Sequence, residues 1–203
     1  MTLLRPCRAD EHPTILDIIN SAATAYRDVI PDDCWHEPYM PPGQFQSELV
    51  AGVAFWGYDI DGVVVGVMGI QPVRDIDLIR HAYVRPHFQR RGVGSELLAH
   101  LRSLSARHML VGTWAAATWA IRFYRRHRFE LVSDEQKTRL LETYWTVPKR
   151  QIEASVVLAN PPLEAAGWRR SGPEARGRSA ECSGGRAKTA RSPQTGAAMA
   201  RID

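Results

Sequence analysis

Long apolar runs, a signal sequence and paired cysteines are all missing from this chain. No stretch approaches the ~18 consecutive apolar residues that a membrane-spanning helix needs, and the first ten residues contain no hydrophobic signal-peptide segment. The three cysteines, Cys7, Cys34 and Cys182, are odd in number and far apart, which argues against a disulfide framework or a zinc site. These absences predict a cytoplasmic protein with reduced thiols and no bound metal.

Net charge is also nearly absent from the first 160 residues. The segment from Pro161 onward carries eight Lys or Arg against four Asp or Glu, and this surplus equals the formal charge of +4 of the whole chain. A basic nucleic-acid-binding core is therefore not indicated. The same segment is rich in Pro, Ala, Gly, Ser and Arg, so it buries too little apolar surface to offset its ordering entropy. We expect one folded domain over residues 1–160 and a disordered basic tail over residues 161–203.

Within the folded part, apolar residues recur at strand and helix spacing in alternating blocks. The strands that this pattern predicts cover residues 2–8, 53–59, 63–70, 76–84, 109–113, 129–132 and 152–158. The predicted helices cover residues 11–27, 44–51, 92–104, 119–127 and 134–142, the last one capped by Asp134. Asp61-Gly62 predicts a hairpin turn, and the proline-rich segment 31–42 predicts an irregular loop.

Residues 83–95 join a strand, a basic glycine-containing loop and the start of a helix. A helix N-terminus offers unpaired N–H donors and about half a positive charge, so this arrangement predicts an anion-binding site. Gly92 and Gly94 lack the β-carbons that would keep a pyrophosphate from the backbone, and Arg90 and Arg91 add full charges nearby. No Lys-Ser/Thr pair follows the glycines, and the spacing is not Gly-x-Gly-x-x-Gly, so a Walker A loop and a dinucleotide fold are unsupported.

Gln89-Arg90-Arg91-Gly92-Val93-Gly94, preceded by Tyr83-Val84-Arg85-Pro86, resembles the acetyl-CoA-binding signature of the GNAT superfamily of N-acetyltransferases. The downstream segment 120–129, with Tyr124 and Phe129, resembles the second signature of that family. The resemblance covers about residues 3–158. It implies an α/β fold with a mixed central sheet of about seven strands, helices on its faces, and a cleft where the fourth strand splays from the fifth.

The resemblance also implies which residues hold acetyl-CoA, the expected co-substrate. The Ala82 amide would bond the thioester carbonyl, and the backbones of Tyr83 and Val84 would offer partners to pantetheine. The remaining cofactor-binding residues that it implies are Gln89, Arg90, Arg91, Gly92, Val93, Gly94, Ser95 and Tyr124. Amine attack in this family is direct, so no cysteine nucleophile is required.

Tyr124 matches the tyrosine that serves this family as general acid toward the departing thiolate. The general base is not singled out by the sequence. His81 and Asp77 are candidates on the predicted strand 76–84, where alternation would place both on one face and Arg80 on the other. Glu48, His36 and a chain of waters remain alternatives.

Two positions depart from the pattern of the family. Ala117 stands where Asn often occurs, which removes one side-chain contact to CoA. Arg128 stands where Gly usually ends the helix with a positive φ, so we expect strain of about 1 kcal/mol there.

The resemblance favours an acetyl-CoA-dependent N-acetyltransferase that acts on a small-molecule amine. Trp35, His36, Glu37 and Tyr39, from the irregular segment 31–42, are the candidate substrate-binding residues, and their aromatic and acidic mixture suits a cationic, partly apolar amine. A non-catalytic acetyl-CoA-binding regulatory module is the alternative, and nucleic-acid binding through the tail is a weaker one. No membrane partner is expected, and a homodimer stays open.

Overall fold

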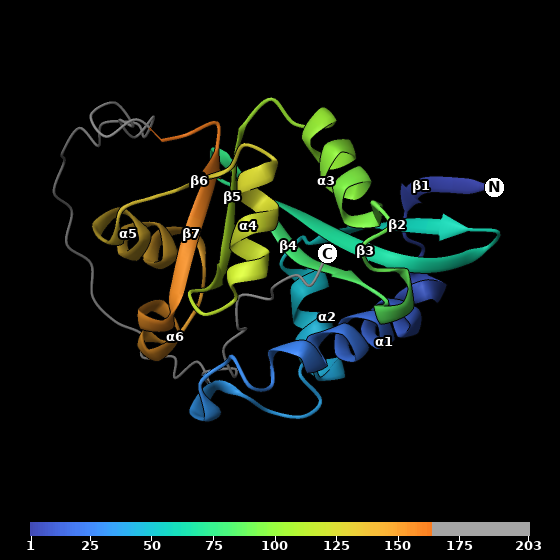
Figure 1. The fold of residues 1–203 in the computed structure, drawn as a ribbon, viewed down its shortest axis with the longest axis horizontal. Helices are drawn as coiled ribbons and strands as arrows, with labels where there is room; N and C mark the ends of the chain where they lie inside the picture. Colours follow the sequence, from blue (N-terminus) through green and yellow to red (C-terminus); the bar gives the residue numbers. More distant parts are fainter. Residues whose placement is uncertain (164–203) are drawn as a thin grey trace, which may run out of the picture.

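Seven strands form one mixed sheet in the order β1-β2-β3-β4-β5-β7-β6 in the computed structural model, which describes residues 1–163 (Figure 1). The strands are β1 Thr2–Pro6, β2 Ala54–Ile60, β3 Val63–Val73, β4 Ile76–Val84, β5 His108–Trp114, β6 Glu130–Leu131 and β7 Ser155–Asn160. Neighbouring strands run antiparallel, except that β4 and β5 are parallel. The predicted mixed α/β sheet is confirmed, whereas the predicted disorder of the tail falls almost wholly on residues 164–203, which lie outside the described part.

Within residues 1–163, six α-helices cover the two faces of the sheet. They are α1 His12–Ala23, α2 Pro42–Val50, α3 Val93–Ser103, α4 Thr118–Arg126, α5 Asp134–Tyr144 and α6 Lys149–Ala154. One core cluster packs side chains of α1, α2, α5 and α6 against one face, and a second packs α3 and α4 against the other. No helix within residues 1–163 is both long and apolar enough to cross a membrane.

Close packing of α3 on the sheet depends on a glycine. A Cβ added to Gly66 on β3 would lie 2.7 Å from Val93 Cγ1 at the start of α3. Real Cβ atoms do not approach a neighbour so closely, so a larger residue here would push α3 away from the sheet. This glycine therefore fixes the position of the helix N-terminus.

Strands β4 and β5 pair along part of their length and then separate. The parallel ladder runs from Ile76↔His108 to Ile79↔Val111 and stops there. Beyond that point β4 continues to pair with β3 through Val84, while β5 pairs with β7 through Trp114. The predicted splay between the fourth and fifth strands is confirmed, and it opens toward the end of β4 that leads into the glycine loop.

A β-bulge interrupts β4 at the point where the splay begins. Gly69 pairs with Arg80 and Val67 with Tyr83, so Met68 faces two residues of β4, His81 and Ala82. His81 adopts a left-handed backbone with φ of 48°. The extra residue ends the alternation of side chains, so Arg80 and His81 both turn toward α2. The prediction that they take opposite faces, with His81 beside Asp77, is wrong for this reason.

Two further element predictions need correction. Asp134 is the first residue of α5, and Ser133 is its N-cap, in a capping box with Gln136. Residues 149–154 form α6, so the last strand begins at Ser155 instead of Ile152. The hairpin at Asp61-Gly62 is confirmed, with φ of 51° and 87°.

Candidate active site

The glycine loop and the first turn of α3 form the candidate anion-binding cradle. Arg90 and Gly92 have φ of 60° and 86°, and the first hydrogen bond of the helix runs from Glu96 N to Gly92 O at 3.0 Å. The amides of residues 92–95 therefore have no acceptor one turn back in the helix. Arg90 and Arg91 are exposed beside them. Gln89 anchors the loop, because its Nε2 donates to Val84 O at 3.0 Å.

The splayed segment of β4 leads directly into this cradle. Residues 82–84 are buried and keep their ladder with β3, but the ladder with β5 has already ended at Ile79. Beyond Ile79 the backbone of β4 makes no ladder bond to β5 within the described residues, although Val84 O already accepts from Gln89 Nε2. An extended chain such as pantetheine fits beside a strand edge of this kind, because main-chain groups supply its hydrogen bonds.

Tyr124 lies on α4 in the core cluster that α3 and α4 form. Its ring packs edge-on against Phe123 and Phe129, with ring centroids at 5.1 and 5.5 Å. Burial raises the pKa of the Tyr124 hydroxyl well above its usual value of about 10. The hydroxyl therefore stays protonated at every physiological pH, as a hydrogen-bond donor must.

His127 connects the end of α4 to the cradle. Its Nε2 lies 3.0 Å from Ser95 Oγ in the first turn of α3. Burial, with Arg102 and Arg126 nearby, lowers the pKa of His127. Sequence reasoning missed this contact, because it joins two helices that lie 32 positions apart in the chain.

A buried charged cluster lies on the opposite face, under the bulge. Glu48 on α2 accepts two bonds from Arg80 Nη2, both at 2.7 Å, and its Oε2 lies 3.2 Å from His81 Nε2. Burial lowers the pKa of His81, although the Glu48 carboxylate opposes this shift. Burial alone would raise the pKa of Glu48, but His81 and Arg80 hold it below its usual range. At neutral pH the cluster is a carboxylate–guanidinium pair beside a neutral imidazole.

Asp77, the other predicted base, lies apart from this cluster. It sits near the start of β4, paired with Met109 in the sheet. Its carboxylate accepts a short hydrogen bond from Ser105 and lies 3.8 Å from Arg107. The structure therefore brings His81 together with Glu48 and leaves Asp77 at the closed end of the splay.

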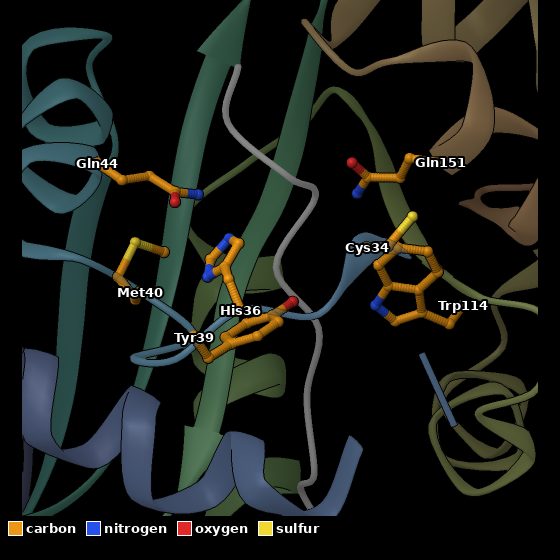
Figure 2. A pocket seen from close by; sticks show the side chains of 7 residues that line it. All are labelled: Cys34, His36, Tyr39, Met40, Gln44, Trp114 and Gln151. Atoms are coloured by element: carbon orange, nitrogen blue, oxygen red, sulfur yellow. The ribbon is translucent and has the colours of Figure 1, made fainter. Parts of the chain in front are cut away.

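A small pocket of about 30 Å³ lies where the loop after α1 meets α2, the end of β5 and α6 (Figure 2). It is lined by Cys34, His36, Tyr39, Met40, Gln44, Trp114 and Gln151. Two of the predicted substrate-binding residues, His36 and Tyr39, belong to this lining. Trp35 stacks on Tyr39 with ring centroids at 5.5 Å, whereas Glu37 is exposed and pairs with Arg27.

Trp114 and Gln151 are pocket residues that sequence reasoning missed. Trp114 ends β5, and Gln151 comes from α6, which the sequence did not predict. Tyr39 also reaches β4, since its ring lies 6.5 Å from that of Tyr83. The pocket thus adjoins the splayed strand on the face opposite to the α3 and α4 cluster.

The two positions that depart from the GNAT pattern behave differently. Ala117 is the buried N-cap of α4 and makes no capping hydrogen bond through its side chain. Arg128 has φ of 65° and follows the last turn of α4, as expected for a position that favours glycine. Phe129 N donates to Tyr124 O at 3.1 Å and Arg128 N to Arg125 O at 3.0 Å, so the helix ends in a Schellman motif.

Comparison with known proteins agrees with the fold. Residues 51–131 match the family model described as the acetyltransferase (GNAT) domain. This match covers β3, β4, the glycine loop, α3, β5 and α4, which carry both signatures. The chain therefore contains a GNAT acetyltransferase domain, and the resemblance that its sequence motifs suggested is confirmed. A search of curated proteins finds no match.

Solved structures with the same fold are distant in sequence. The PaiA N-acetyltransferase of Thermoplasma acidophilum, solved with coenzyme A, aligns with a TM-score of 0.57 and 10% identity, over 78% of this chain and 98% of its own. A GNAT acetyltransferase of Staphylococcus aureus aligns with a TM-score of 0.58 and 13% identity, over the same shares. The ribosomal-protein-S18-alanine N-acetyltransferase of Escherichia coli aligns with a TM-score of 0.53 and 16% identity, over 78% of this chain and 92% of its own. At these identities the likeness shows the fold alone.

Proposed function

We propose that this protein is an acetyl-CoA-dependent N-acetyltransferase that acts on the amine of a small molecule, by direct attack within a ternary complex. One observation carries the proposal. The splay of β4 from β5 lies between an anion cradle at the start of α3 and the pocket beside Tyr39 and Trp114. A donor with a phosphate end and an acyl end spans such an arrangement, and the acceptor amine enters from the pocket.

The cradle and the splayed strand hold the donor. The amides at the start of α3 and the exposed Arg90 and Arg91 bind the pyrophosphate, and the backbones of Tyr83 and Val84 bind pantetheine. The Ala82 amide, next to the bulge, donates to the thioester oxygen as negative charge develops there. A donor of this kind contributes about 3–4 kcal/mol at comparable sites.

Tyr124 acts on the departing sulfur. A hydroxyl of ordinary pKa near 10 would transfer its proton to a thiolate of pKa near 8.5 at a cost of about 2 kcal/mol, and burial increases that cost. Tyr124 therefore donates a hydrogen bond to the sulfur while the carbon–sulfur bond breaks, and the proton follows as the thiol forms.

The amine has to lose a proton before or during attack. For a lysine-like amine this costs about 4.6 kcal/mol at pH 7. His81, kept neutral by burial, is the proton acceptor in our proposal, and Glu48 stabilises the imidazolium that forms. Because the His81 side chain is fully buried, the proton reaches it through water that enters from the pocket.

The buried position of His81 and the missing side-chain cap at Ala117 favour one alternative, a module that binds acetyl-CoA without turning it over. A screen of amines with acetyl-CoA that follows thiol release separates the two. We expect at least one amine to release CoA stoichiometrically with N-acetyl product. Tight CoA binding by calorimetry with no thiol release from any amine would establish the module instead.

A further inference from the structure

The pocket beside Tyr39 is built from rings and neutral polar groups. None of the described residues that line it is a carboxylate, a lysine or an arginine. Tyr39 stacks with two other rings of its own loop, with centroids 5.5 Å from Trp35 and 6.1 Å from His36. Trp114 closes the opposite wall (Figure 2). Such walls bind an apolar or aromatic body, and their ring faces attract a single ammonium group.

Three acidic side chains near the pocket already have arginine partners. Glu37 pairs with Arg27 at the surface, and Asp33 Oδ2 lies 2.9 Å from Arg150 Nε. The buried Glu48 takes both of its short bonds from Arg80. A substrate with a second positive charge would find no unpaired carboxylate among these three. The pocket therefore discriminates against polyamines and lysine-rich peptides.

Gln151 supplies a specific donor. Its side chain is 4% exposed, and its Nε2 makes no hydrogen bond with any described residue. Figure 2 shows the Gln151 amide pointing from α6 toward the middle of the pocket. A buried donor without a partner costs free energy, and a ligand oxygen that accepts its hydrogen removes this cost.

We propose that the acceptor substrate is a monoamine with an aromatic body and one oxygen acceptor that bonds to Gln151 Nε2. The inference rests on the acetyltransferase function proposed above and specifies its substrate class. Glu37, predicted from the sequence as an acidic substrate contact, has no part in it, because its carboxylate is turned away to Arg27.

A panel of six compounds tests the substrate class on the full chain. The probes are phenethylamine, its three methoxy isomers, spermidine, and a short peptide with an N-terminal alanine. We expect kcat/KM for the best methoxyphenethylamine to exceed that for spermidine and for the peptide by at least about 100-fold. Equal or faster acetylation of spermidine or of the peptide would overturn the inference and leave the acetyltransferase function intact.

The role of Gln151 has its own test. The best methoxy isomer should exceed phenethylamine in kcat/KM by about ten-fold, which is the value of one hydrogen bond. Gln151→Met, which removes the amide at similar size, should abolish this difference. Gln46→Met is the matched control, because Gln46 is exposed on α2, and it should retain the full difference. A ten-fold preference that persists in Gln151→Met would refute the assigned contact.

A binding measurement keeps the two proposals separable. Quenching of tryptophan fluorescence reports occupation of the pocket, since Trp114 lines it. Saturable quenching by the methoxy isomer, weakened about ten-fold in Gln151→Met but without thiol release, would support the ligand class and overturn catalysis. Absence of both quenching and acetylation with all three isomers would overturn the ligand class.

Discussion

Tyr124 has the environment of a permanent hydrogen-bond donor. Its hydroxyl stays protonated because burial raises its pKa, and its ring is fixed by Phe123 and Phe129. If it stabilises the departing sulfur, Tyr124→Phe should lower kcat about 100-fold and leave the KM for acetyl-CoA within about two-fold. Steady-state thiol-release kinetics, with calorimetry of CoA binding, measure both quantities.

Tyr144→Phe is the control for loss of a tyrosine hydroxyl. Tyr144 is also buried, but its hydroxyl bonds to Asp75 Oδ1 at 3.0 Å, beyond the closed end of the splay. This variant should keep kcat within about two-fold. Equal kcat in Tyr124→Phe and in the unaltered protein would remove Tyr124 from the mechanism.

Arg128 occupies a position that suits glycine better. Its φ of 65° costs a residue with a Cβ about 1 kcal/mol, and the Schellman hydrogen bonds depend on backbone atoms alone. Arg128→Gly should therefore raise the free energy of unfolding by about 1 kcal/mol and Tm by about 3 °C. Arg122→Gly, at an exposed position inside α4, should lower the free energy of unfolding by about the same amount. Unfolding in urea distinguishes them, and destabilisation by both changes would contradict our account of Arg128.

At the scale of elements, α2 is held against β4 by the Glu48–Arg80 pair. Glu48 is 2% exposed and Arg80 is 7% exposed, so neither charge has water to replace its partner. Glu48→Gln leaves the guanidinium buried without a carboxylate and should lower the free energy of unfolding by about 3–5 kcal/mol. The double variant Glu48→Leu with Arg80→Met should recover most of this loss, because both charges are gone. A double variant as unstable as the sum of its two single changes would disprove the pairing.

The sequence predicts most elements of this fold, because periodicity and glycine positions are local signals. The bulge at His81 is different, since it depends on two residues of β4 facing Met68 on another strand. No local pattern marks it, so the alternation rule misplaced His81 relative to Arg80. The pocket shares this difficulty, because Gln151 joins it from a helix that begins after Pro148 and was interpreted as part of a strand.

Two other incorrect element predictions could have been avoided, because the sequence contains a local signal for the true boundary. Ser133-x-x-Gln136 has the pattern of a capping box, and it places the N-cap one residue before the predicted Asp134. Pro148, followed by polar residues, marks the start of α6 in the same way. Glu37 could not have been excluded from the sequence, because its exposure and its partner Arg27 depend on how the loop folds.

At the scale of the whole molecule, the free energy of unfolding should fall in two separate ranges of pH as the solution is acidified. Burial holds the pKa of His81 below its unfolded value of about 6.5, so below that pH the unfolded chain binds a proton that the folded chain does not. Stability therefore falls as pH decreases through this range, by at most about 1.4 kcal/mol per pH unit for each such histidine. His127, whose pKa is also lowered, adds to the same loss of stability.

The loss of stability at lower pH comes from the protonation of carboxylates. The hydrogen bond from Arg5 lowers the pKa of Glu11 to about 2, and the pKa of Glu48 is also below its usual range. Their contributions are complete above a pH of about 4.5 and are lost as pH falls toward 2.

Urea unfolding at a series of pH values measures both losses of stability. His81→Asn, which tolerates a left-handed backbone, should flatten the slope between about pH 6.5 and 5 without removing it. Glu11→Gln should leave the change of stability between about pH 6.5 and 5 unaltered and should reduce the change of stability below a pH of about 4.5. If the dependence of stability on pH between about pH 6.5 and 5 is unchanged in His81→Asn, protonation of His81 does not contribute to the loss of stability.

The short ladder between β4 and β5 also determines how the molecule opens. Within residues 1–163 four residue pairs join these strands, whereas β3 and β4 remain paired up to Val84 and β5 and β7 up to Trp114. Breaking these four pairs leaves the ladders of β1-β2-β3-β4 and of β5-β7-β6 intact. The boundary between β4 and β5, called the seam, is therefore an independent unit of hydrogen exchange. Amides of residues 76–79 and 108–111 that bond across it should exchange together, faster than those of β3. If CoA spans the seam, it should slow both segments in parallel, which makes deuterium uptake a measure of donor binding that needs no acceptor amine.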